Sequence, residues 1–255
     1  MSDLRTLAAL VDEAARTATP IPQLTLAHDL GVDDAYAVQA LSMARRYERG
    51  ERRIGIKMGL TSRAKMAQVG VSEMTWGRLT NAMRREEGGA LSRAGFIHPR
   101  AEPEVAFLIK SRLSGVVTAV EAMAAVEAVA PAVEIIDSRY ENFKFTWADV
   151  VADNSSSSAF FVGGWSKPDT DISNLAITVA VDGRPVQIGS TAAILGHPVR
   201  SLVAAARLVA QWGEALNPGD IVMAGGATAA HPLSVGNYVS AQFETLGRVA
   251  FNVEA

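Results

Sequence analysis

The residues with the clearest capacity for chemistry are three glutamates, two of which are separated by a single proline. Glu102 and Glu104 flank Pro103, and in an extended segment residues two apart point to the same side. Two carboxylates that close together repel each other and need a compensating cation to stay ionised. Hard cations such as Mg²⁺ and Mn²⁺ prefer oxygen ligands of this kind. The alternative is a solvated polar strand end, and Pro103, which lacks a backbone donor, fits an edge or the start of a strand.

Glu134 favours the metal interpretation of this pair. It lies within the apolar run 132–136, which is otherwise typical of a buried strand. A buried carboxylate is costly unless it is paired or bound to a metal. A basic partner such as Arg139 or Arg100 would also satisfy it, so the residue types leave both a metal site and a buried ion pair open.

Lys57 lies on a short apolar segment, residues 53–60, which predicts a strand. Alternation places the large apolar side chains on one face and Lys57 on the other, between Gly55 and Gly59. The two glycines leave room for a ligand to approach the backbone beside the lysine. The alternative is a surface lysine that extends from an edge strand into solvent.

Four serines, Ser155 to Ser158, run directly into the apolar segment 159–163, so their hydroxyls can line a cleft. A nucleophilic serine is not indicated, because no Gly-x-Ser-x-Gly elbow is present and no histidine is near in sequence. The glycine-rich segment 223–230 lacks the lysine of a phosphate-binding loop and predicts only a tight turn beside a site.

Two residue types exclude further kinds of site. The four histidines show no metal-ligand spacing, so we expect structural or surface roles for them. The chain has no cysteine, which rules out disulfides, thiolate zinc sites, iron–sulfur clusters and cysteine nucleophiles.

The elements that must position these residues change in kind along the chain. Helical patterns dominate the first fifty residues, and strand patterns dominate from about residue 96. Helices are predicted from residue 4 to the prolines at 20 and 22, and over 33–48, 61–70, 118–130 and 198–216. Strands are predicted over 53–60, 104–110, 133–136, 221–224 and 238–253, with a hairpin over 175–188 that turns at Asp182-Gly183.

This order of elements indicates the fold class. Helices come first, strands with a few helices follow, and regular βαβ alternation is missing. The pattern predicts an α+β protein with a mixed or antiparallel sheet, and it argues against a Rossmann fold or a (β/α)₈ barrel. A polar, glycine-ended stretch at 84–89 suggests a smaller, mainly helical N-terminal region, residues 1–85, and a β-rich catalytic domain, residues 86–255.

Composition limits the classes of partner. The chain has 255 residues, of which 49% are hydrophobic, and this is enough for a substantial core. A formal net charge of −3 gives no general attraction to nucleic acid or to an anionic membrane. An anionic substrate therefore needs local cations. The first nineteen residues predict an amphipathic helix and not a signal peptide. No charge-free apolar run approaches the roughly 18 residues that span a bilayer, so we expect a soluble, cytoplasmic protein.

A series of motifs in one order extends this interpretation. It consists of KMGLT at 57–61, WGRLT at 76–80, EPEVAF at 102–107, EIIDSRY at 134–140, NF at 142–143, DNSSS at 153–157, GS at 189–190, ILG at 194–196, PGD at 218–220 and AG at 224–225. The series resembles the 2-oxohex-3-enedioate (4-oxalocrotonate) decarboxylases of catechol meta-cleavage pathways. Their sister family, the 2-hydroxypenta-2,4-dienoate hydratases, shares the fumarylacetoacetate-hydrolase-like fold. The resemblance covers about residues 52–250 and implies a mixed β-sheet roll of that type behind the helical N-terminal part.

The resemblance also assigns roles to individual residues. It implies that the ligands of Mg²⁺ or Mn²⁺ are Glu102, Glu104 and Glu134, and that Lys57 is the catalytic residue. The substrate contacts that we expect are Leu60, Arg78, Ser156 and Ser157, with one of the two serines hydrogen-bonding the substrate.

The implied activity is metal-dependent decarboxylation of 4-oxalocrotonate, a small dicarboxylic 2-oxo acid, to 2-hydroxypenta-2,4-dienoate and CO₂. No organic cofactor is needed, because the 2-oxo group of the substrate accepts the electrons. The sister hydratases carry an acidic residue near this part of the chain that helps to deliver water, and none lies between Trp76 and Arg85 here. Asn81 departs from the aspartate that the resemblance leads us to expect at this position.

Three other activities are alternatives. The first is hydration of 2-hydroxypenta-2,4-dienoate, and the second is a non-catalytic partner subunit of such a hydratase. The retained charges at Lys57 and the three glutamates argue against a non-catalytic role. The third, acylpyruvate hydrolysis, needs a His–Glu pair to activate water, and no such pair is identified. A complex with a 2-hydroxypentadienoate hydratase is the partner that the resemblance suggests.

Overall fold

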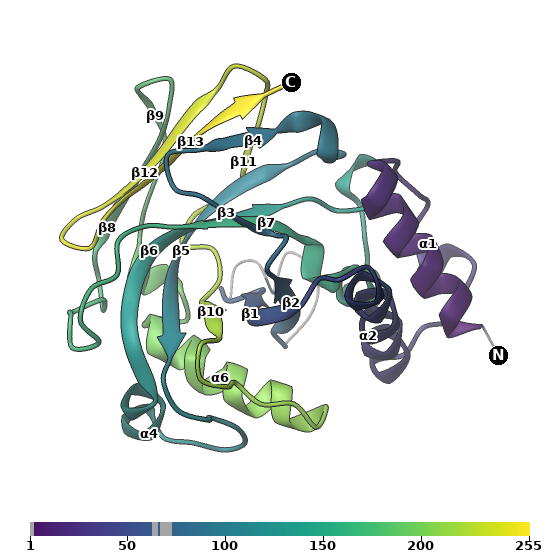
Figure 1. Ribbon diagram of the computed structural model, residues 1–255, viewed down its shortest axis with the longest axis horizontal. Helices are drawn as coiled ribbons and strands as arrows, with labels where there is room; N and C mark the ends of the chain where they lie inside the picture. The colour runs from purple at the N-terminus through teal and green to yellow at the C-terminus, as the bar shows by residue number, and fades with distance from the viewer. Residues whose placement is uncertain (1–2, 63–65, 67–72) are drawn as a thin grey trace.

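The computed structural model describes residues 3–62, 66 and 73–255 (Figure 1). The helices are α1 (Leu4–Thr17), α2 (Val32–Glu48), α4 (Ala119–Ala124), α5 (Trp147–Ala152) and α6 (Pro198–Gln211). The strands are β1 (Arg53–Gly59), β2 (Thr75–Thr80), β3 (Arg84–Arg85), β4 (Ala90–Ser92), β5 (Arg100–Ile109), β6 (Val126–Ile136), β7 (Ser157–Val162), β8 (Ala176–Val181), β9 (Arg184–Ser190), β10 (Ile221–Met223), β11 (His231–Pro232), β12 (Tyr238–Phe243) and β13 (Gly247–Glu254).

Within the described residues the strands form two sheets, both of mixed direction. The larger has eight strands in the order β2-β1-β10-β5-β6-β7-β3, with β11 also paired to β5. The smaller has five, in the order β4-β13-β12-β8-β9. In Figure 1 the long strands β5 and β6 run side by side, and α6 lies below β1 and β10 in that view. The predicted α+β class, with a helical N-terminal part followed by curled mixed sheets, is confirmed.

The N-terminal helices pack against each other at the end of the molecule away from the five-stranded sheet (Figure 1). The side chain of Asp3 caps α1 by accepting a hydrogen bond from the backbone of Arg5. The buried Asp12 of α1 pairs with Arg45 and Arg49 of α2 at 2.8 and 2.6 Å. Apolar packing and this ion-pair cluster together hold the two helices at a defined angle.

Several predicted elements are confirmed by the backbone. The hairpin of β8 and β9 turns at Asp182 and Gly183, which both have positive φ, as a two-residue turn of this kind requires. The predicted helix over 198–216 is α6, which ends at Gln211. The helix predicted over 61–70 falls largely on residues outside the described ranges and stays a prediction.

The long helix predicted over 118–130 is wrong beyond its first turns. Thr118 caps α4 through a capping box with Glu121, but α4 ends at Ala124 and β6 begins at Val126. The alanines favour a helix locally, yet β6 pairs with β5 from Ile136 back to Val126 and buries most of its length. Pairing and burial outweigh helix propensity, which amounts to less than about 1 kcal/mol per residue.

Two prolines, Pro103 and Pro131, lie within paired strands, so the expectation that Pro103 marks an edge or the start of a strand is wrong. The backbone oxygen of Pro103 accepts a hydrogen bond from Ala227, and the nitrogen of a strand residue points to the same side as its oxygen. On that side of β5, Pro103 lies between the positions that pair with β10 and those that pair with β11. Pro131 accepts from Gly163, where the register of β7 against β6 ends. Each missing donor therefore falls where a ladder hydrogen bond is already absent.

The division of the chain at residue 85 stays a prediction. Both α1 and α2 precede it, but β1 and β2 also precede it and join the larger sheet. β1 runs parallel to β10, with Lys57 paired to Met223 across 166 positions of the chain. Strands from both predicted regions therefore share one sheet.

The segment 191–211, which contains α6, is long and apolar enough to cross a membrane by length and composition alone. However, 56% of its most apolar window is buried inside the protein. The residues of α6 that face inward include Leu202, Ala205 and Val209. We assign it as a core helix.

The two sheets contact each other through a stacked pair of phenylalanines, Phe161 of β7 and Phe251 of β13. Their ring centroids lie 4.2 Å apart, and both side chains are fully buried. We expect Phe251→Ala to lower the free energy of unfolding by about 3–5 kcal/mol, because it removes a large buried ring and leaves a cavity. Urea unfolding measures this, and Ile188→Ala, at a position 79% exposed, should change stability by less than about 0.5 kcal/mol. A loss below about 1 kcal/mol for Phe251→Ala would contradict the packing described here.

Candidate metal centre and active site

The three glutamates meet because β5 and β6 are paired in one register. Glu102 of β5 lies directly opposite Glu134 of β6, and Glu104 follows two residues along β5 on the same face. One carboxylate oxygen from each lies within 4.8 Å of the others. Among the described residues this is the one cluster of three potential metal-ligating side chains. The predicted group of metal-ligand candidates is thus brought together by strand pairing.

The environment of these carboxylates opposes their charge. Glu104 and Glu134 are fully buried. Burial raises the pKa of Glu104 well above its usual range, and the neighbouring Glu134 raises it further. Burial also raises the pKa of Glu134, although Lys57 partly offsets this. Oε2 of Glu104 accepts a hydrogen bond of 2.6 Å from the backbone of Gly225, whereas Oε1 is buried with no hydrogen-bond partner among the described residues.

A divalent cation fits this set of residues. The cluster offers oxygen ligands only, which suits Mg²⁺ or Mn²⁺. Three carboxylates beside one lysine carry an excess of two negative charges, which a divalent ion would neutralise. The unpartnered Oε1 of Glu104 is a free acceptor at the same place. A buried polar oxygen of this kind is costly unless something binds it.

Lys57 is buried and belongs to the same cluster. Its Nζ lies 2.9 Å from Oε2 of Glu134 and donates to the backbone oxygen of Ser155, also at 2.9 Å. The surface-lysine interpretation is therefore wrong for this residue. The predicted ion-pair alternatives for Glu134 are wrong too, because Arg139 pairs with the buried Asp153 and the cation beside Glu134 is Lys57.

Close contacts with protein atoms require glycine on either side of Lys57. A β-carbon at Gly55 would lie 1.9 Å from the backbone oxygen of Ile221 on β10. A β-carbon at Gly59 would lie 2.5 Å from the hydroxyl of Thr75 and 2.6 Å from that of Ser155. Any larger residue at either position would displace the neighbouring chain. The predicted room for a ligand is therefore absent at Gly55, whereas Gly59 lines the same cavity as Lys57.

A cavity of about 680 Å³ opens above Lys57 and Glu102. Of the predicted substrate contacts, Leu60 and Ser156 line it. The hydroxyl of Ser156 is buried and has no hydrogen-bond partner among the described residues. Ser157 is fully buried outside the lining, where its hydroxyl stabilises the charged form of Glu134.

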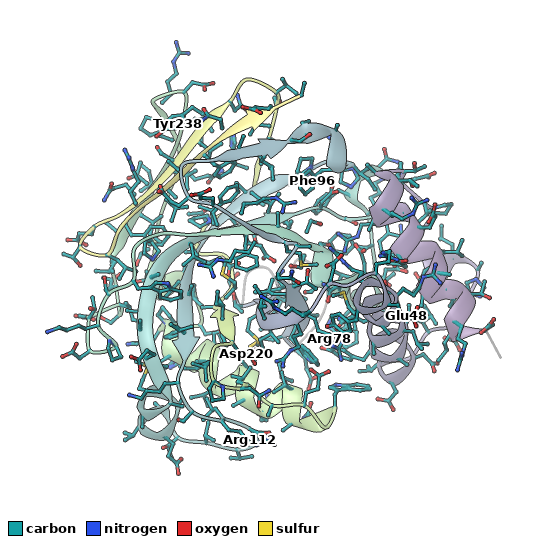
Figure 2. All side chains as sticks on the ribbon, in the orientation of Figure 1. Glu48, Arg78, Phe96, Arg112, Asp220 and Tyr238 are labelled. Carbon is teal, nitrogen blue, oxygen red and sulfur yellow. The ribbon has the colours of Figure 1, made fainter. Side chains whose placement is uncertain are left out.

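Arg78, like Ser157, is a predicted substrate contact that lies outside the lining of this cavity. In β2 it pairs with Ile56 and not with Lys57, so its side chain leaves the opposite face of the sheet. Its guanidinium donates to Gln39 of α2 at 2.5 Å and pairs with Glu214, which follows α6. In Figure 2 Arg78 lies between these two helices. Because Arg78 lies one position along β2 from Gly77, the partner of Lys57, its side chain and that of Lys57 are on opposite faces of the sheet.

The cavity also has a wall that the sequence alone did not indicate. Its lining includes Arg100, Asn142, Phe143, Lys144 and Phe145. The guanidinium of Arg100 stacks 4.1 Å from the centre of the Phe143 ring. Arg100 lies two residues before Glu102, so strand alternation could have placed it on the same face.

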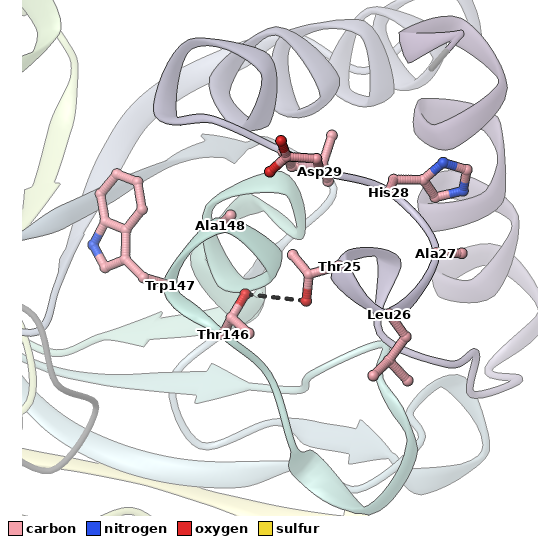
Figure 3. A pocket seen from close by; sticks show the side chains of 9 residues that line it. Thr25, Leu26, Ala27, His28, Asp29, Thr146, Trp147 and Ala148 are labelled. Atoms are coloured by element: carbon pink, nitrogen blue, oxygen red, sulfur yellow. Dashed lines mark hydrogen bonds between the residues drawn. The ribbon is translucent and has the colours of Figure 1, made fainter. Parts of the chain in front are cut away.

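A second hollow of about 570 Å³ lies between residues 25–30 and 146–148 (Figure 3). Thr146 donates a hydrogen bond of 3.4 Å to the hydroxyl of Thr25, as Figure 3 shows. Both threonines also bond to the carboxylate of Asp149 at 2.8 Å. The polar groups here are used to attach the N-terminal segment to α5, and no cluster of metal-ligating side chains is found in the described part of this hollow.

A family model described as the C-terminal domain of fumarylacetoacetate (FAA) hydrolase matches residues 56–254. The chain therefore belongs to the fumarylacetoacetate hydrolase family. A solved fumarylpyruvate hydrolase from Pseudomonas aeruginosa, in complex with Mn²⁺ and pyruvate, has a TM-score of 0.64 at 15% identity over 80% of this chain and 89% of its own. That similarity concerns the fold alone.

Within the family the chain is similar to the decarboxylases. It is 55% identical to a 4-oxalocrotonate decarboxylase of Pseudomonas sp. over 246 residues, which is 96% of each chain. A solved 4-oxalocrotonate decarboxylase from Pseudomonas putida G7, complexed with magnesium and adipate, has a TM-score of 0.95 at 37% identity, covering 98% of this chain and 97% of that one. A 2-hydroxyhexa-2,4-dienoate hydratase of Comamonas testosteroni is 35% identical over 92% of this chain and 91% of its own. The resemblance found from the motifs is confirmed.

The burial of the Glu104 carboxylate predicts that metal binding raises the thermal stability of the protein. Glu104→Gln removes a carboxylate whose burial is uncompensated without a cation. We expect the metal-free variant to melt about 2–4 °C higher than the wild type, the shift for roughly 1 kcal/mol in a chain of this length. Mg²⁺ should raise the melting temperature of the wild type, because it binds the folded state, and should not raise that of the variant.

Thermal unfolding with and without Mg²⁺ measures both effects. Glu127→Gln is the matched control, because Glu127 lies on β6, the strand paired with that of Glu104, but is exposed. It should leave both melting temperatures unchanged. Equal stabilisation of wild type and Glu104→Gln by Mg²⁺ would rule out Glu104 as a ligand.

Proposed function

We propose that this protein is a metal-dependent decarboxylase that converts 4-oxalocrotonate to 2-hydroxypenta-2,4-dienoate and CO₂ in the meta-cleavage degradation of aromatic compounds. The observation that carries the proposal is the buried cluster of three carboxylates beside Lys57 at the base of a cavity. The similarity to 4-oxalocrotonate decarboxylases over almost the whole chain supports it.

Glu102, Glu104 and Glu134 would hold Mg²⁺ or Mn²⁺, for which their oxygens are suitable ligands. The bound ion supplies positive charge that stabilises the negative charge developing on the substrate's 2-oxo group. Gly225 fixes one oxygen of Glu104 by its backbone hydrogen bond and leaves the other free. The orientation of the carboxylate is therefore set before any ligand arrives.

The reaction needs no organic cofactor, because the substrate carries its own electron acceptor. The bond between C5 and the leaving carboxylate breaks, and its electron pair forms a double bond between C4 and C5. The former C3–C4 double bond moves to C2–C3, and the last pair reaches the 2-oxo oxygen. Protonation of that oxygen gives 2-hydroxypenta-2,4-dienoate. The protein must therefore hold positive charge, and a proton donor, near one oxygen.

Lys57 is the residue that we propose for this role. Its ammonium group has three donors, and two of them are directed to Glu134 and Ser155. The described residues offer no partner for the third, which would serve the substrate, since Lys57 lines the cavity. Because Lys57 lies deep beside Glu134, its position varies little, and little reorganisation is needed as charge develops.

The remaining substrate contacts are proposed from the lining of the cavity. Ser156 offers a buried hydroxyl without a partner among the described residues, and Leu60 offers an apolar surface. Arg100 and Lys144 provide the local positive charge that a dianionic substrate needs, since the chain as a whole is anionic. Contact between Arg78 and the substrate stays a prediction, and its side chain is engaged by Gln39 and Glu214.

Two further expectations accompany the proposed reaction. Because the product is the substrate of 2-hydroxypentadienoate hydratases, a complex with such a hydratase would pass it on directly. Relatives of the chain include hydratases of this type. We also propose that the protein acts in the cytoplasm. Neither expectation requires a nucleic acid or a membrane as a partner.

Incubation of the purified protein with Mg²⁺ and 4-oxalocrotonate tests the function. We expect release of one CO₂ per substrate and formation of 2-hydroxypenta-2,4-dienoate, followed by NMR. Chelation of the metal with EDTA should abolish both, and added Mg²⁺ or Mn²⁺ should restore them. Hydration of 2-hydroxypenta-2,4-dienoate without CO₂ release from 4-oxalocrotonate would instead assign the chain to the hydratases.

The role of Ser156 is tested by steady-state kinetics of Ser156→Ala. Loss of one hydrogen bond to the substrate should lower kcat/KM by about 2- to 10-fold, the equivalent of roughly 0.5–1.5 kcal/mol. Ser158→Ala is the control, because the Ser158 hydroxyl accepts from Arg139 at 2.6 Å and lies outside the cavity lining. If the two variants behave alike, Ser156 does not contact the substrate.

A further inference from the structure

Three consecutive residues in the turn before β7 adopt the left-handed conformation. Asn154, Ser155 and Ser156 have φ values of 48°, 55° and 57°. For residues other than glycine this conformation costs on the order of 1 kcal/mol each and persists only where the surroundings hold it. The turn contains the backbone carbonyl of Ser155, which accepts a hydrogen bond from Lys57. It also contains Ser156, which lines the cavity. What holds it in place therefore matters for the site.

The side chain of Asn154 attaches this turn to β2. Its Oδ1 accepts a hydrogen bond of 2.7 Å from the backbone nitrogen of Arg78, and its Nδ2 donates one of 2.9 Å to the backbone oxygen of the same residue. Among the described strands β2 is the end member of its sheet. The buried amide of Asn154 thus makes the pair of bonds that a neighbouring strand residue would make. Such a two-point attachment sets both distance and register.

Two further residues of β2, Gly77 and Thr75, support the same attachment. A β-carbon at Gly77 would lie 2.3 Å from the backbone oxygen of Asn154, so only glycine allows the turn to approach. The hydroxyls of Thr75 and Ser155 are hydrogen-bonded at 2.7 Å. The turn therefore contacts β2 at three positions, Thr75, Gly77 and Arg78.

The attachment reaches the active site through Lys57. Gly77 is the register partner of Lys57 on the neighbouring strand, so the turn crosses β2 directly beside the lysine. The backbone oxygen of Ser155 then lies 2.9 Å from Nζ of Lys57. Ser156, the next residue, enters the cavity lining. The side-chain amide of Asn154 thus helps to fix the positions of the Ser155 carbonyl and of Ser156.

We propose that Asn154 is a positioning residue that places the carbonyl of Ser155 against Lys57 and the hydroxyl of Ser156 against the substrate. This inference rests on the proposed function, because it concerns the same site. Asn154 itself is buried behind the turn and does not line the cavity. Its effect on the reaction is exerted through its neighbours.

The test combines Asn154→Gly with Ser156→Ala. Glycine tolerates the left-handed backbone but removes both bonds to Arg78. We expect kcat/KM for 4-oxalocrotonate to fall by roughly 10- to 100-fold, the loss typical of a displaced catalytic group. Ser156→Ala should lower kcat/KM in the wild-type background but change it by less than about twofold in Asn154→Gly, because the serine is already displaced. Asn154→Asp keeps the acceptor for the backbone nitrogen of Arg78. Its kcat/KM should therefore lie between that of the wild type and that of Asn154→Gly.

Binding of 2-oxoadipate provides a measurement that is independent of turnover. This 2-oxo diacid lacks the double bond that connects the leaving carboxylate to the ketone. Calorimetry should show weaker 2-oxoadipate binding to Asn154→Gly than to the wild type, with unchanged affinity for Mg²⁺. Asp12→Asn is the control, because Asp12 is a buried polar side chain that pairs with Arg45 and Arg49 at the contact of α1 with α2 and does not touch the turn. It should lower stability in urea while kcat/KM stays within about twofold.

The outcomes separate the two proposals. Wild-type kcat/KM in Asn154→Gly, unchanged affinity for 2-oxoadipate, or full additivity with Ser156→Ala would each overturn the positioning role. If the wild type binds 2-oxoadipate and Asn154→Gly weakens that binding, but no CO₂ is released from 4-oxalocrotonate, the proposed function fails and the positioning role stands. Failure of the wild type to bind 2-oxoadipate would overturn both.

Discussion

The constraint on which the rest of the site depends is the burial of three carboxylates against one lysine. Register pairing of β5 with β6 puts Glu102 opposite Glu134, with Glu104 next to them, in an interior where their charges are costly. Lys57 compensates one charge through its contact with Glu134. Because the described residues compensate only part of this negative charge, we expect metal binding and folding stability to be linked.

A second buried charge pair supports the same region from behind. Asp153 is fully buried, and burial raises its pKa to about 7 even though Arg139 stabilises its charged form. Arg139 also donates to the backbone oxygens of Asp137 and Asp153, so it connects the end of β6 to the turn before β7. Together with the amide of Asn154, it holds a turn that would otherwise relax from its left-handed conformation. Structural ion pairing and catalytic geometry are therefore adjacent but separate.

Much of the site was predictable because its signals are local. Two glutamates flanking one proline have to share a face if the segment is extended, and a glutamate within an apolar strand has to find a partner. The helix over 118–130 failed for the opposite reason, since its alanines report only local preference and β6 is stabilised by pairing with β5. The motif does not say which face of β2 Arg78 occupies, and the register with β1 places it outside the cavity lining, so its contact with the substrate stays a prediction.

The sequence by itself determined the fold class, the turn of the β8–β9 hairpin, the carboxylate cluster and the family. Each of these depends on a local signal, namely hydrophobic alternation, turn residues or contiguous motifs. Only the tertiary structure decided which cation meets Glu134, which serine enters the cavity and what fixes the turn to β2. These depend on contacts between residues that are 76 to 98 positions apart, as with Asn154 and Arg78 or Lys57 and Ser155. Spacing along the chain carries no information about such distances until strand pairing and burial bring the segments together.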